Sequence, residues 1–472
     1  MIRVAIVGAG PAGIAAAGVL AAHGVAVTVI DEGRQPGGQI YRRARAGLTL
    51  DIETLLGAEV ANYRHFHAVF DRLRDRIDYR PQTLVWGVHD KQLHTVRAGI
   101  ADTVDFDRLI LATGATDRVL PIPGWTLPGV FTLGGAQVLL KEHGCLIGRR
   151  IVFCGSSPLL YLAARQYRAM GADIAAVLDT TPLIAKAGAA ADLMAAPRTL
   201  ARGLAYMRAL WRASVPLHHG VTLSAFEGVS GVAAVRFRDR GNREHTIACD
   251  GVAVGFGLKP ETQLAELAGA ALAYDSTFRQ WLPRADADGR CGGDVYVAGD
   301  GATVGGAEAA AITGELAASA VLEDAGIPVA DIDRGRLRRR AARLRRFQRG
   351  LARAFAWPVA AIEAFDDNVM VCRCEGITAG TLRQSLRDGF GPTEVNRLKA
   401  ITRCGMGRCQ GRFCVLAAAE LTAQSLGLPL EAVGRLRTQA PIKPIPLAVR
   451  AAGLNPAENI AAAAPGGTSA PA

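Results

Sequence analysis

Two stretches of the chain repeat one pattern of hydrophobic and polar positions. The first covers residues 3–32 and the second covers residues 150–179. In each, a short apolar run leads into a turn of small residues, a run with helical spacing follows, and a second apolar run ends at an acidic residue. This pattern predicts a buried strand, a helix and a parallel strand. The chain is therefore expected to contain two doubly wound α/β units.

The order of the patterns predicts that one unit is inserted into the other. A third apolar strand ends in VYVAGDG at residue 301 and would return the chain to the first sheet. We expect a first α/β domain at 1–125 and 252–330, an inserted α/β domain at 126–251, a basic linker helix at 331–365, a small helical domain at 366–430, and an extended arm with a disordered tail at 431–472.

The composition excludes a membrane-spanning protein. Among 472 residues, half are hydrophobic and 54 are Gly, yet no apolar run reaches the roughly 18–20 residues of a membrane span. A signal peptide at the N-terminus is disfavoured, because cleavage would remove the first small-residue turn. We expect a cytoplasmic protein, and a peripheral position on the inner face of the membrane stays open. Clustered cysteines in that compartment are more often metal ligands or redox groups than structural disulfides.

Much of the net charge of +11 is concentrated in one segment. Residues 334–355 carry ten Arg and no acidic residue, with apolar residues at near-helical spacing. One interpretation is a docking face for an acidic partner, a nucleic acid or a membrane. The favoured interpretation is a solvated helix with one face packed on the protein. Its two aromatic residues, Phe347 and Phe355, belong to the apolar positions of the helix and do not form base-stacking platforms, so we expect no nucleic-acid partner.

The first small-residue turn has the GxGxxG spacing of a dinucleotide site. VAIVGAGPAG contains Gly8, Gly10, Pro11, Ala12 and Gly13 between an apolar strand and an Ala-rich helix. The first glycine would make the tight turn, the second would let the backbone approach a pyrophosphate, and the third would let helix and strand pack closely. The helix N-terminus would face the phosphates with free N–H groups.

An acidic residue stands where a ribose would be recognised. Asp31 ends the second strand, 23 residues after Gly8, and Glu32 follows it. The Asp31 carboxylate could accept hydrogen bonds from both ribose hydroxyls, which argues against a 2′-phosphate at this site.

Two later motifs extend this site and give it a family resemblance. LILATGA is a buried strand ending in a small-residue turn, and VYVAGDG ends a strand before another helix. With these motifs the chain resembles the two-dinucleotide-binding-domain flavoproteins, which include thioredoxin reductase and nitrite reductase. The resemblance implies FAD in the first domain, with Asp300 at the ribityl or phosphate region and PGGQIYR beside the flavin. The further candidate contacts are Gly38, Gln39, Thr113, Gly114, Gly299, Gly306 and Ala307; no residue is assigned a catalytic role.

The second turn departs from the glycine pattern. Gly155 matches the first glycine, but Ser157 and Leu160 stand at the second and third positions. Asp179 still follows 24 residues after Gly155. A Cβ at Ser157 would crowd a pyrophosphate. Either this domain binds a nucleotide differently or weakly, or it is a retained scaffold. No C-x-x-C stands near the flavin motifs, so thioredoxin reductase activity is not expected.

Five of the nine cysteines lie within about forty residues. VCRCEG supplies Cys372 and Cys374, and RCGMGRCQGRFC supplies Cys404, Cys409 and Cys414. The segment between them is expected to be a helix, a turn and a helix, which would bring the pairs together. C-x-C followed by a distant pair resembles the BFD-like [2Fe–2S] domain, first known from bacterioferritin-associated ferredoxin, and favours a two-iron cluster over zinc or free thiols.

The resemblance implies four thiolate ligands, which leaves one cysteine over. The expected ligand set is Cys372, Cys374, Cys409 and Cys414, with Cys404 as the spare thiol. The alternative set pairs the C-x-C with Cys404 and Cys409.

The full order of motifs resembles the A or α subunits of bacterial opine oxidases, D-hydroxyproline dehydrogenase and hydrogen cyanide synthase. The stretches DEGRQPGGQIYR and KAITRCGMGRCQGRFC carry this resemblance. It implies an FAD-dependent oxidoreductase component that acts on CH–NH or CH–NH₂ donors, together with an amino-acid-oxidase-like β flavoprotein and, in some members, a ferredoxin-like γ subunit. It also leaves open a second nucleotide or an interface FMN, and electron delivery to a quinone.

Two other functional classes stay open. One is a self-contained NAD(P)H-dependent flavin and [2Fe–2S] reductase. The other is a non-enzymatic iron–sulfur partner that only delivers electrons, against which the intact FAD motifs weigh. The proline-rich stretch APIKPIPL, residues 440–447, would either extend along a partner or lie on the protein's own surface.

Overall fold

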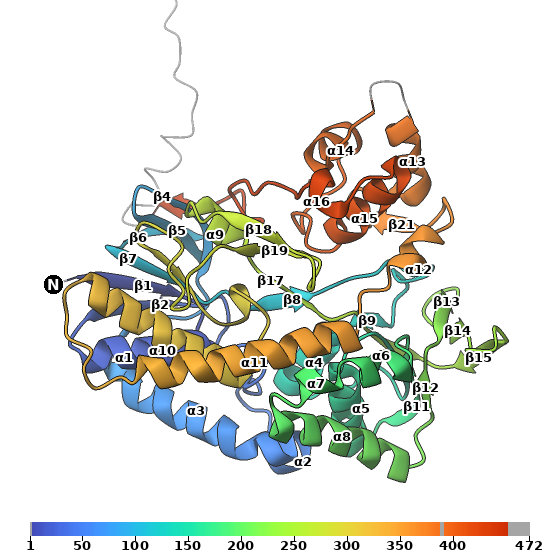
Figure 1. Ribbon diagram of the computed structural model, residues 1–472, viewed down its shortest axis with the longest axis horizontal. Coiled ribbons are helices and arrows are strands. Elements are labelled where there is room, and N and C mark those ends of the chain that lie inside the picture. The colour runs from blue at the N-terminus through green and yellow to red at the C-terminus, as the bar shows by residue number, and fades with distance from the viewer. Residues whose placement is uncertain (1, 388–390, 452–472) are drawn as a thin grey trace, which may run out of the picture.

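The computed structural model describes residues 2–387 and 391–451 (Figure 1). Its first sheet is parallel, as predicted, and has the strand order β20-β7-β1-β2-β3. Val4 to Ile6 are almost fully buried, which fits a strand covered on both faces. The strands are β1 (Arg3–Val7), β2 (Ala26–Ile30), β3 (Asp78–Arg80), β7 (Arg108–Leu111) and β20 (Val295–Val297).

Helices cover one face of this sheet and a second sheet covers the other. Helix α1 (Pro11–Ala22) packs along α10 (Ala307–Asp324), and α3 (Val60–Leu73) lies beside them (Figure 1). The opposite face shares a core with the four-stranded order β23-β6-β5-β4. The remaining elements here are β4 (Leu84–His89), β5 (Gln92–Arg97), β6 (Ile100–Asp105), β23 (Arg450–Ala451), α2 (Ile52–Leu56), η1 (Gly57–Glu59) and η2 (Arg74–Arg76).

The inserted domain has its own five-stranded parallel sheet, β12-β11-β10-β16-β9. Strand β16 (Gly251–Gly255) belongs to it, so the insert continues past residue 251, where the sequence pattern predicts its end. The pattern missed this because a buried apolar strand does not reveal which of two similar sheets it joins. The other strands are β9 (Val130–Thr132), β10 (Arg150–Gly155), β11 (Asp173–Asp179) and β12 (Leu217–His219).

Helices and a small antiparallel sheet surround the insert. The helices are α4 (Leu133–His143), α5 (Leu159–Ala169), α6 (Leu183–Gly188), α7 (Ala190–Leu193) and α8 (Pro197–Arg212), and the strands are β13 (Thr222–Glu227), β14 (Ala234–Arg238) and β15 (Glu244–Ala248). The chain enters and leaves the insert through the antiparallel pair β8 (Ala115–Asp117) and β17 (Leu258–Pro260), which lie side by side. They are followed by α9 (Gln263–Leu267), β18 (Leu272–Asp275) and β19 (Gln280–Pro283).

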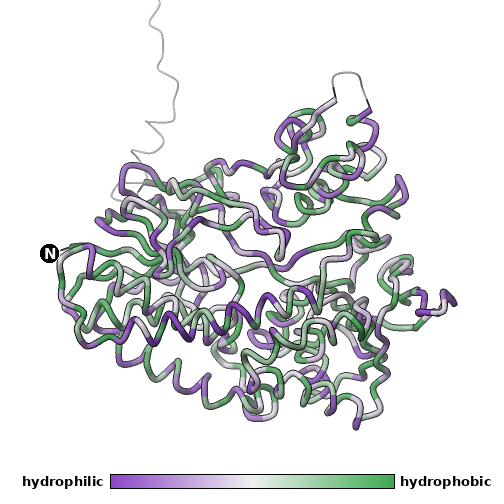
Figure 2. Tube along the Cα trace, in the orientation of Figure 1, coloured by the Kyte–Doolittle hydropathy of each residue, from purple (hydrophilic) through white to green (hydrophobic). Residues whose placement is uncertain are grey.

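The basic segment forms one long helix, α11 (Arg334–Ala354), with hydrophilic residues along much of its length (Figure 2). Leu344, Phe347 and Ala354 are buried against the protein. The helix packs on α10, α6 and α7, so it spans the first domain and the insert. Arg334 and Arg338 pair with the buried carboxylate of Asp288. This matches the expected solvated helix with one packed face.

The cysteine-rich unit is a small helical domain beside both α/β domains (Figure 1). The expected helix, turn and helix are α13 (Ala379–Arg387) and α14 (Val395–Thr402). The other elements are α12 (Val359–Glu363), β21 (Met370–Cys372), β22 (Ile377–Thr378), α15 (Val415–Leu426) and α16 (Leu430–Val433).

The arm beyond α16 returns to the first domain. Ile442 is buried in the core of that domain, and its N–H donates to the carbonyl oxygen of Trp86 at 2.9 Å. β23 then pairs with β6. Of the two arrangements left open, the arm takes the one on the protein's own surface. The expected disordered tail, from residue 455, lies outside the described residues. No helix within the described part of the chain is long and apolar enough to cross a membrane.

Candidate dinucleotide site and cysteine cluster

The glycine turn has the close contacts that its spacing predicts. Gly8 follows β1 with φ of +110°, and a Cβ there would lie 2.2 Å from the carbonyl oxygen of Ala112. A Cβ on Gly13 would lie 1.8 Å from the carbonyl oxygen of Gly8. Gly10 is the N-cap of α1, and Pro11 occupies its first turn, where no N–H partner is required. Glycine at these positions therefore lets the helix begin directly against the strand.

The Asp31 carboxylate braces this turn from the end of β2. Its two oxygens accept hydrogen bonds from the N–H groups of Ala9, at 2.5 Å, and Gly33, at 2.6 Å. Burial raises the pKa of Asp31, against the lowering effect of both hydrogen bonds. Glu32 points elsewhere and forms an ion pair with Lys443 of the arm. Ribose recognition by these two acids stays a prediction.

The PGGQIYR loop folds back onto the glycine turn. The Gly37 N–H donates to the carbonyl oxygen of Ala9 at 2.9 Å, and Gly37 has φ of +130°. A Cβ on Gly38 would lie 3.2 Å from the Cα of Gly10. Lys141, a buried residue of α4, donates to the carbonyl oxygens of Gln39 and Ile40 at 3.4 and 3.2 Å. A backbone cradle free of side chains thus forms where a pyrophosphate is expected, which fits a dinucleotide.

His67 of α3 holds the same loop. Its Nε2 donates to the carbonyl oxygen of Tyr41 at 2.9 Å, and the residue is only 4% exposed. Burial lowers the pKa of His67 to about 4, and the positive charge of Arg43 acts in the same direction. The folded protein therefore prefers the neutral imidazole.

We expect His67 to weaken the fold as pH falls from about 6.5 towards about 4. A folded-state pKa below the unfolded value gives stability that is present at neutral pH and lost on acidification. Between pH 7 and pH 5 this amounts to about 2 kcal/mol. His67→Gln keeps a donor for Tyr41 but cannot titrate, so its free energy of unfolding should fall less over that range. Equal pH dependence in denaturant titrations of both proteins would contradict this assignment.

The strand-end aspartate lies at the same edge of the first sheet. Asp300 follows β20 in the turn η3 (Gly299–Gly301), and its carboxylate accepts hydrogen bonds from the N–H groups of Gly305, at 2.7 Å, and Gly306, at 3.0 Å. Burial raises the pKa of Asp300, against both hydrogen bonds. Gly306, with φ of +82°, is the N-cap of α10, and Ala307 is its first residue. Asp300 therefore fixes the loop that leads into α10, and its contact with a cofactor stays a prediction.

The LATGA turn completes the edge. The Thr113 hydroxyl donates to the carbonyl oxygen of Glu261 at 2.7 Å, and a Cβ on Gly301 would lie 2.7 Å from that hydroxyl oxygen. The structure therefore brings together at one sheet edge four segments distant in sequence: the glycine turn, the PGGQIYR loop, the Thr113–Gly114 turn and the start of α10.

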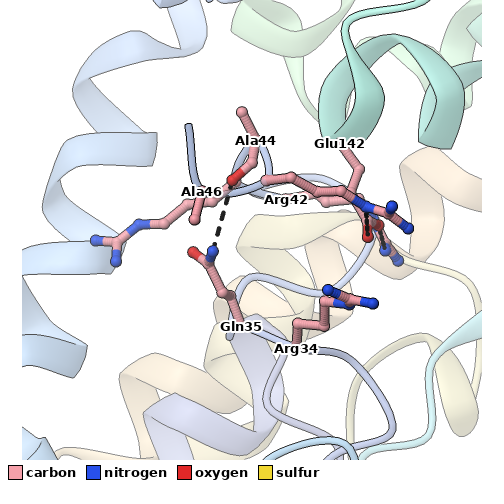
Figure 3. A pocket seen from close by; sticks show the side chains of 8 residues that line it. Arg34, Gln35, Arg42, Ala44, Ala46 and Glu142 are labelled. Carbon is pink, nitrogen blue, oxygen red and sulfur yellow. Dashed lines mark hydrogen bonds and ion pairs between the residues drawn. The ribbon is translucent and has the colours of Figure 1, made fainter. Parts of the chain in front are cut away.

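An arginine-rich cavity of about 150 Å³ adjoins this edge, and no sequence pattern predicted it (Figure 3). Its charged lining residues are Arg34, Arg42, Arg43, Arg45 and Glu142. Arg42 pairs with Glu142 at 2.5 Å, yet its buried Nε has no partner among the described residues. Arg42 and Arg45 share Glu142, and Arg43 pairs with Asp71 outside the lining, so the four guanidinium groups still exceed their carboxylates and favour an anionic group such as a phosphate. The arginines that follow PGGQIY in the sequence could have indicated this cavity.

In the insert, the acidic residue that corresponds to Asp31 is Asp179, and it already has partners inside the protein. The Asp179 carboxylate accepts from the Tyr161 hydroxyl and Lys186 Nζ, both at 2.5 Å, and from the Thr181 N–H at 2.8 Å. Burial alone would raise the pKa of Asp179, but its partners, including His219, hold it below its ordinary value. Both carboxylate oxygens are thus engaged, and a ribose would have to displace an ion pair.

All five clustered cysteines lie in one loop-rich corner of the small domain. The sulfur atoms of Cys372, Cys404 and Cys414 lie within 4.8 Å of one another, and all three residues are buried. Hydrogen bonds from Cys404 and Cys414 lower the pKa of Cys372, which favours its thiolate. Cys374 and Cys409 lie close enough to interact with each other. This donor set fits a cluster held by thiolates.

Cys404 occupies a different place from the one expected of a spare thiol. It belongs to the most compact trio, whereas Cys374 and Cys409 are only half-buried. The assignment of four ligands among five cysteines stays a prediction, and the geometry makes Cys404 a stronger candidate than its spacing did. Glycine is required at 407, because a Cβ there would lie 2.3 Å from the Cβ of Cys374.

Known proteins match this chain over nearly its whole length. The pyridine nucleotide-disulphide oxidoreductase family matches residues 2–321, and the sarcosine oxidase A3 domain matches residues 367–454. The A subunit of opine oxidase from Agrobacterium tumefaciens (strain Ach5) is 35% identical over 466 residues, covering 94% of this chain and 90% of that protein. Hydrogen cyanide synthase subunit HcnB from Pseudomonas aeruginosa is 32% identical over 465 residues, covering 94% and 97%.

The fold also matches a solved structure. The crystal structure of L-proline dehydrogenase from P. horikoshii superimposes with a TM-score of 0.70 at 20% identity, covering 95% of this chain and 79% of that chain. At that identity the match confirms the α/β architecture alone.

Proposed function

The chain belongs to the family of opine oxidase A subunits, and from that premise we propose that it is the electron-transferring flavin and iron–sulfur subunit of a heteromeric amine or amino-acid dehydrogenase. Membership makes it a flavin oxidoreductase subunit with an FAD-type dinucleotide domain. The observation that carries the finer proposal is the presence, in one chain, of that domain and a five-cysteine cluster docked against it.

The first domain supports FAD as the resident dinucleotide. Gly10 and Gly38 leave backbone N–H groups and no side chains where the pyrophosphate would lie, and Gly306 starts α10 towards the expected flavin end. FAD would supply the ability to accept two electrons together and release them singly. The chain's own contribution is to hold that cofactor in a fixed, largely buried position.

The cysteine cluster supports a [2Fe–2S] centre. A buried trio with two further thiols beside it provides more than the four thiolates that such a centre requires. Such a centre would supply a one-electron step, and the small domain would hold it within reach of the flavin.

The insert supports a scaffold role in preference to nicotinamide binding. Asp179, the expected ribose acceptor, is already paired with Lys186. Ser157 is buried and accepts a hydrogen bond from the Leu159 N–H at 3.2 Å, so its side chain fills the position that a pyrophosphate would need. A second nucleotide or an interface FMN would bring a phosphate, and the arginine-rich cavity has the charge to receive one.

Substrate oxidation belongs, in this proposal, to a partner. The relatives are named as subunits of opine oxidase and hydrogen cyanide synthase. We propose that a β flavoprotein removes hydride from a C–N centre of an opine, D-hydroxyproline or glycine-type donor. This chain would then carry the electrons onwards to a quinone or another acceptor, in some assemblies with a ferredoxin-like γ subunit.

The test is to purify the chain alone and together with the β flavoprotein encoded beside it. We expect the chain alone to contain FAD, iron and sulfide but to reduce a dye with opine, D-hydroxyproline or glycine at a negligible rate, and the complex to do so rapidly. Robust amine oxidation by the single chain would refute the two-subunit arrangement. Rapid reduction of the flavin by NADH or NADPH in stopped-flow mixing would instead favour the self-contained reductase.

A further inference from the structure

A buried ion pair joins the dinucleotide edge to the cysteine cluster. Arg412 Nε lies 2.7 Å from Glu261 Oε2, and Arg412 Nη2 lies 3.2 Å from Glu261 Oε1. The two side chains are only 10% and 12% exposed. Because the guanidinium is rigid and planar, its two hydrogen bonds fix the orientation of Arg412 relative to Glu261 as well as the distance between them.

The Thr113–Gly114 turn, which follows β7 of the first sheet, holds Glu261 in place. Its N–H donates to the carbonyl oxygen of Gly114 at 2.9 Å, and its carbonyl oxygen accepts from the Thr113 hydroxyl at 2.7 Å. Its backbone is therefore tied on both sides to a turn that also contacts Gly301, beside Asp300. A shift of the dinucleotide edge would carry Glu261 with it.

Arg412 is held by the cysteine loop. It lies between Cys409 and Cys414, and its Nη1 donates to the carbonyl oxygen of Cys409 at 3.3 Å. The same group donates to the carbonyl oxygen of Ile442 at 2.8 Å, which ties in the returning arm. Beside it, Gln263 Nε2 donates to the carbonyl oxygen of Gln410 at 3.1 Å. A shift of the loop would carry Arg412 with it.

Stability alone does not explain a buried pair at this place. An apolar contact of similar volume is often as stabilising as a buried ion pair. What the ion pair adds is a fixed distance and orientation between the two segments. Within residues 2–387 and 391–451, other ion pairs also join the first domain to this part of the chain, among them Arg279 with Glu420 of α15 and Glu266 with Arg435 at the start of the arm. Neither involves a residue between the clustered cysteines.

We propose that Glu261 and Arg412 are positioning residues that fix the separation between the flavin end of the dinucleotide site and the iron–sulfur loop. The inference rests on the proposed electron-transfer function. Each transfer would move one electron from reduced flavin to the oxidised cluster without any bond forming between them, and the protons that the flavin loses over its full oxidation would pass to water.

The experiment compares wild type, Glu261→Gln, Arg412→Lys and the matched control Arg279→Lys, all as full-length chains loaded with cofactors. Iron, sulfide and FAD contents and both midpoint potentials are measured first. Flavin is then photoreduced by a laser flash, and cluster reduction is followed by its visible absorbance. We expect electron exchange at least about tenfold slower in Glu261→Gln and Arg412→Lys, because small misplacements of a site have large kinetic effects. Arg279→Lys should remain at the wild-type rate.

The outcomes separate this inference from the proposed function. A wild-type chain without iron and sulfide would refute the proposed function. Wild-type rates in both Glu261→Gln and Arg412→Lys would overturn the inference alone, as would equal slowing in Arg279→Lys, which would make the pair one of several general docking contacts. Arg412→Lys keeps the positive charge at this position. Its electron-exchange rate therefore still tests the inference if Glu261→Gln binds less iron.

Discussion

Cys372→Ser should abolish the proposed [2Fe–2S] cluster and reduce bound iron and sulfide to background. Cys372 belongs to both ligand sets considered and to the compact trio with Cys404 and Cys414. Cys372 ends β21, so a strand fixes the position of its sulfur. A serine hydroxyl is a much poorer ligand for iron than a thiolate. The measurements are iron and sulfide analysis and the visible spectrum of the purified chain.

The matched control for this variant is Cys249→Ser. Cys249 is also buried, at 5% exposure against 1% for Cys372, but it lies in the inserted domain and outside the cluster. It should keep full iron. A Cys372→Ser protein with normal iron content and an unchanged spectrum would contradict the thiolate cluster itself.

Single replacements of the other cysteines then assign the remaining ligands. The set expected from the family resemblance predicts that Cys404→Ser retains the spectrum and Cys409→Ser loses it. The position of Cys404 beside Cys372 and Cys414 makes loss of the spectrum in Cys404→Ser a specific alternative.

Gly13→Ala should prevent FAD binding and destabilise the first domain by about 3 kcal/mol, the upper end of the usual cost of overpacking. The new methyl group would lie 1.8 Å from the Gly8 carbonyl oxygen, and 3.3 Å from the Ile6 side chain. Because the nearest atom belongs to the backbone, α1 would have to move away from β1. That movement would pull the helix N-terminus from the expected pyrophosphate position.

Gly18→Ala provides the control within the same helix. A Cβ on Gly18 would meet no atom within 4 Å, and alanine favours the helix by about 0.5–1 kcal/mol over glycine. Flavin absorbance per protein and the free energy of unfolding should therefore fall in Gly13→Ala and remain or rise in Gly18→Ala. Equal flavin content in both variants would mean that close packing at Gly13 is not needed for the cofactor.

The local motifs were predictable because their causes lie within a few residues. Gly13 meets the Gly8 carbonyl oxygen, a contact between one strand and the helix that directly follows it. VYVAGDG likewise places Asp300 directly beside the start of its helix. Predicting the cysteine cluster required only that a helix, a turn and a helix bring two short cysteine-containing segments together.

The unpredicted features join residues that are far apart in the sequence. Glu261 and Arg412 are separated by 151 positions, and nothing in either local pattern indicates the other. Lys141 of the inserted domain reaches the PGGQIYR loop in the same way. The closure of the second site also needed the fold, since His219 of β12 reaches Asp179 at the end of β11.

The return of the arm has a consequence for how the protein is made. The first domain begins with β1 at residue 3, yet Ile442 enters its core and β23 closes its second sheet at residue 451. On a ribosome, this domain must therefore wait until residues 442–451 have been made before Ile442 can be buried and the last strand can pair. The insert and the small domain lie between these ends, so they can fold earlier, and the final burial of Ile442 would draw the finished small domain against its neighbour.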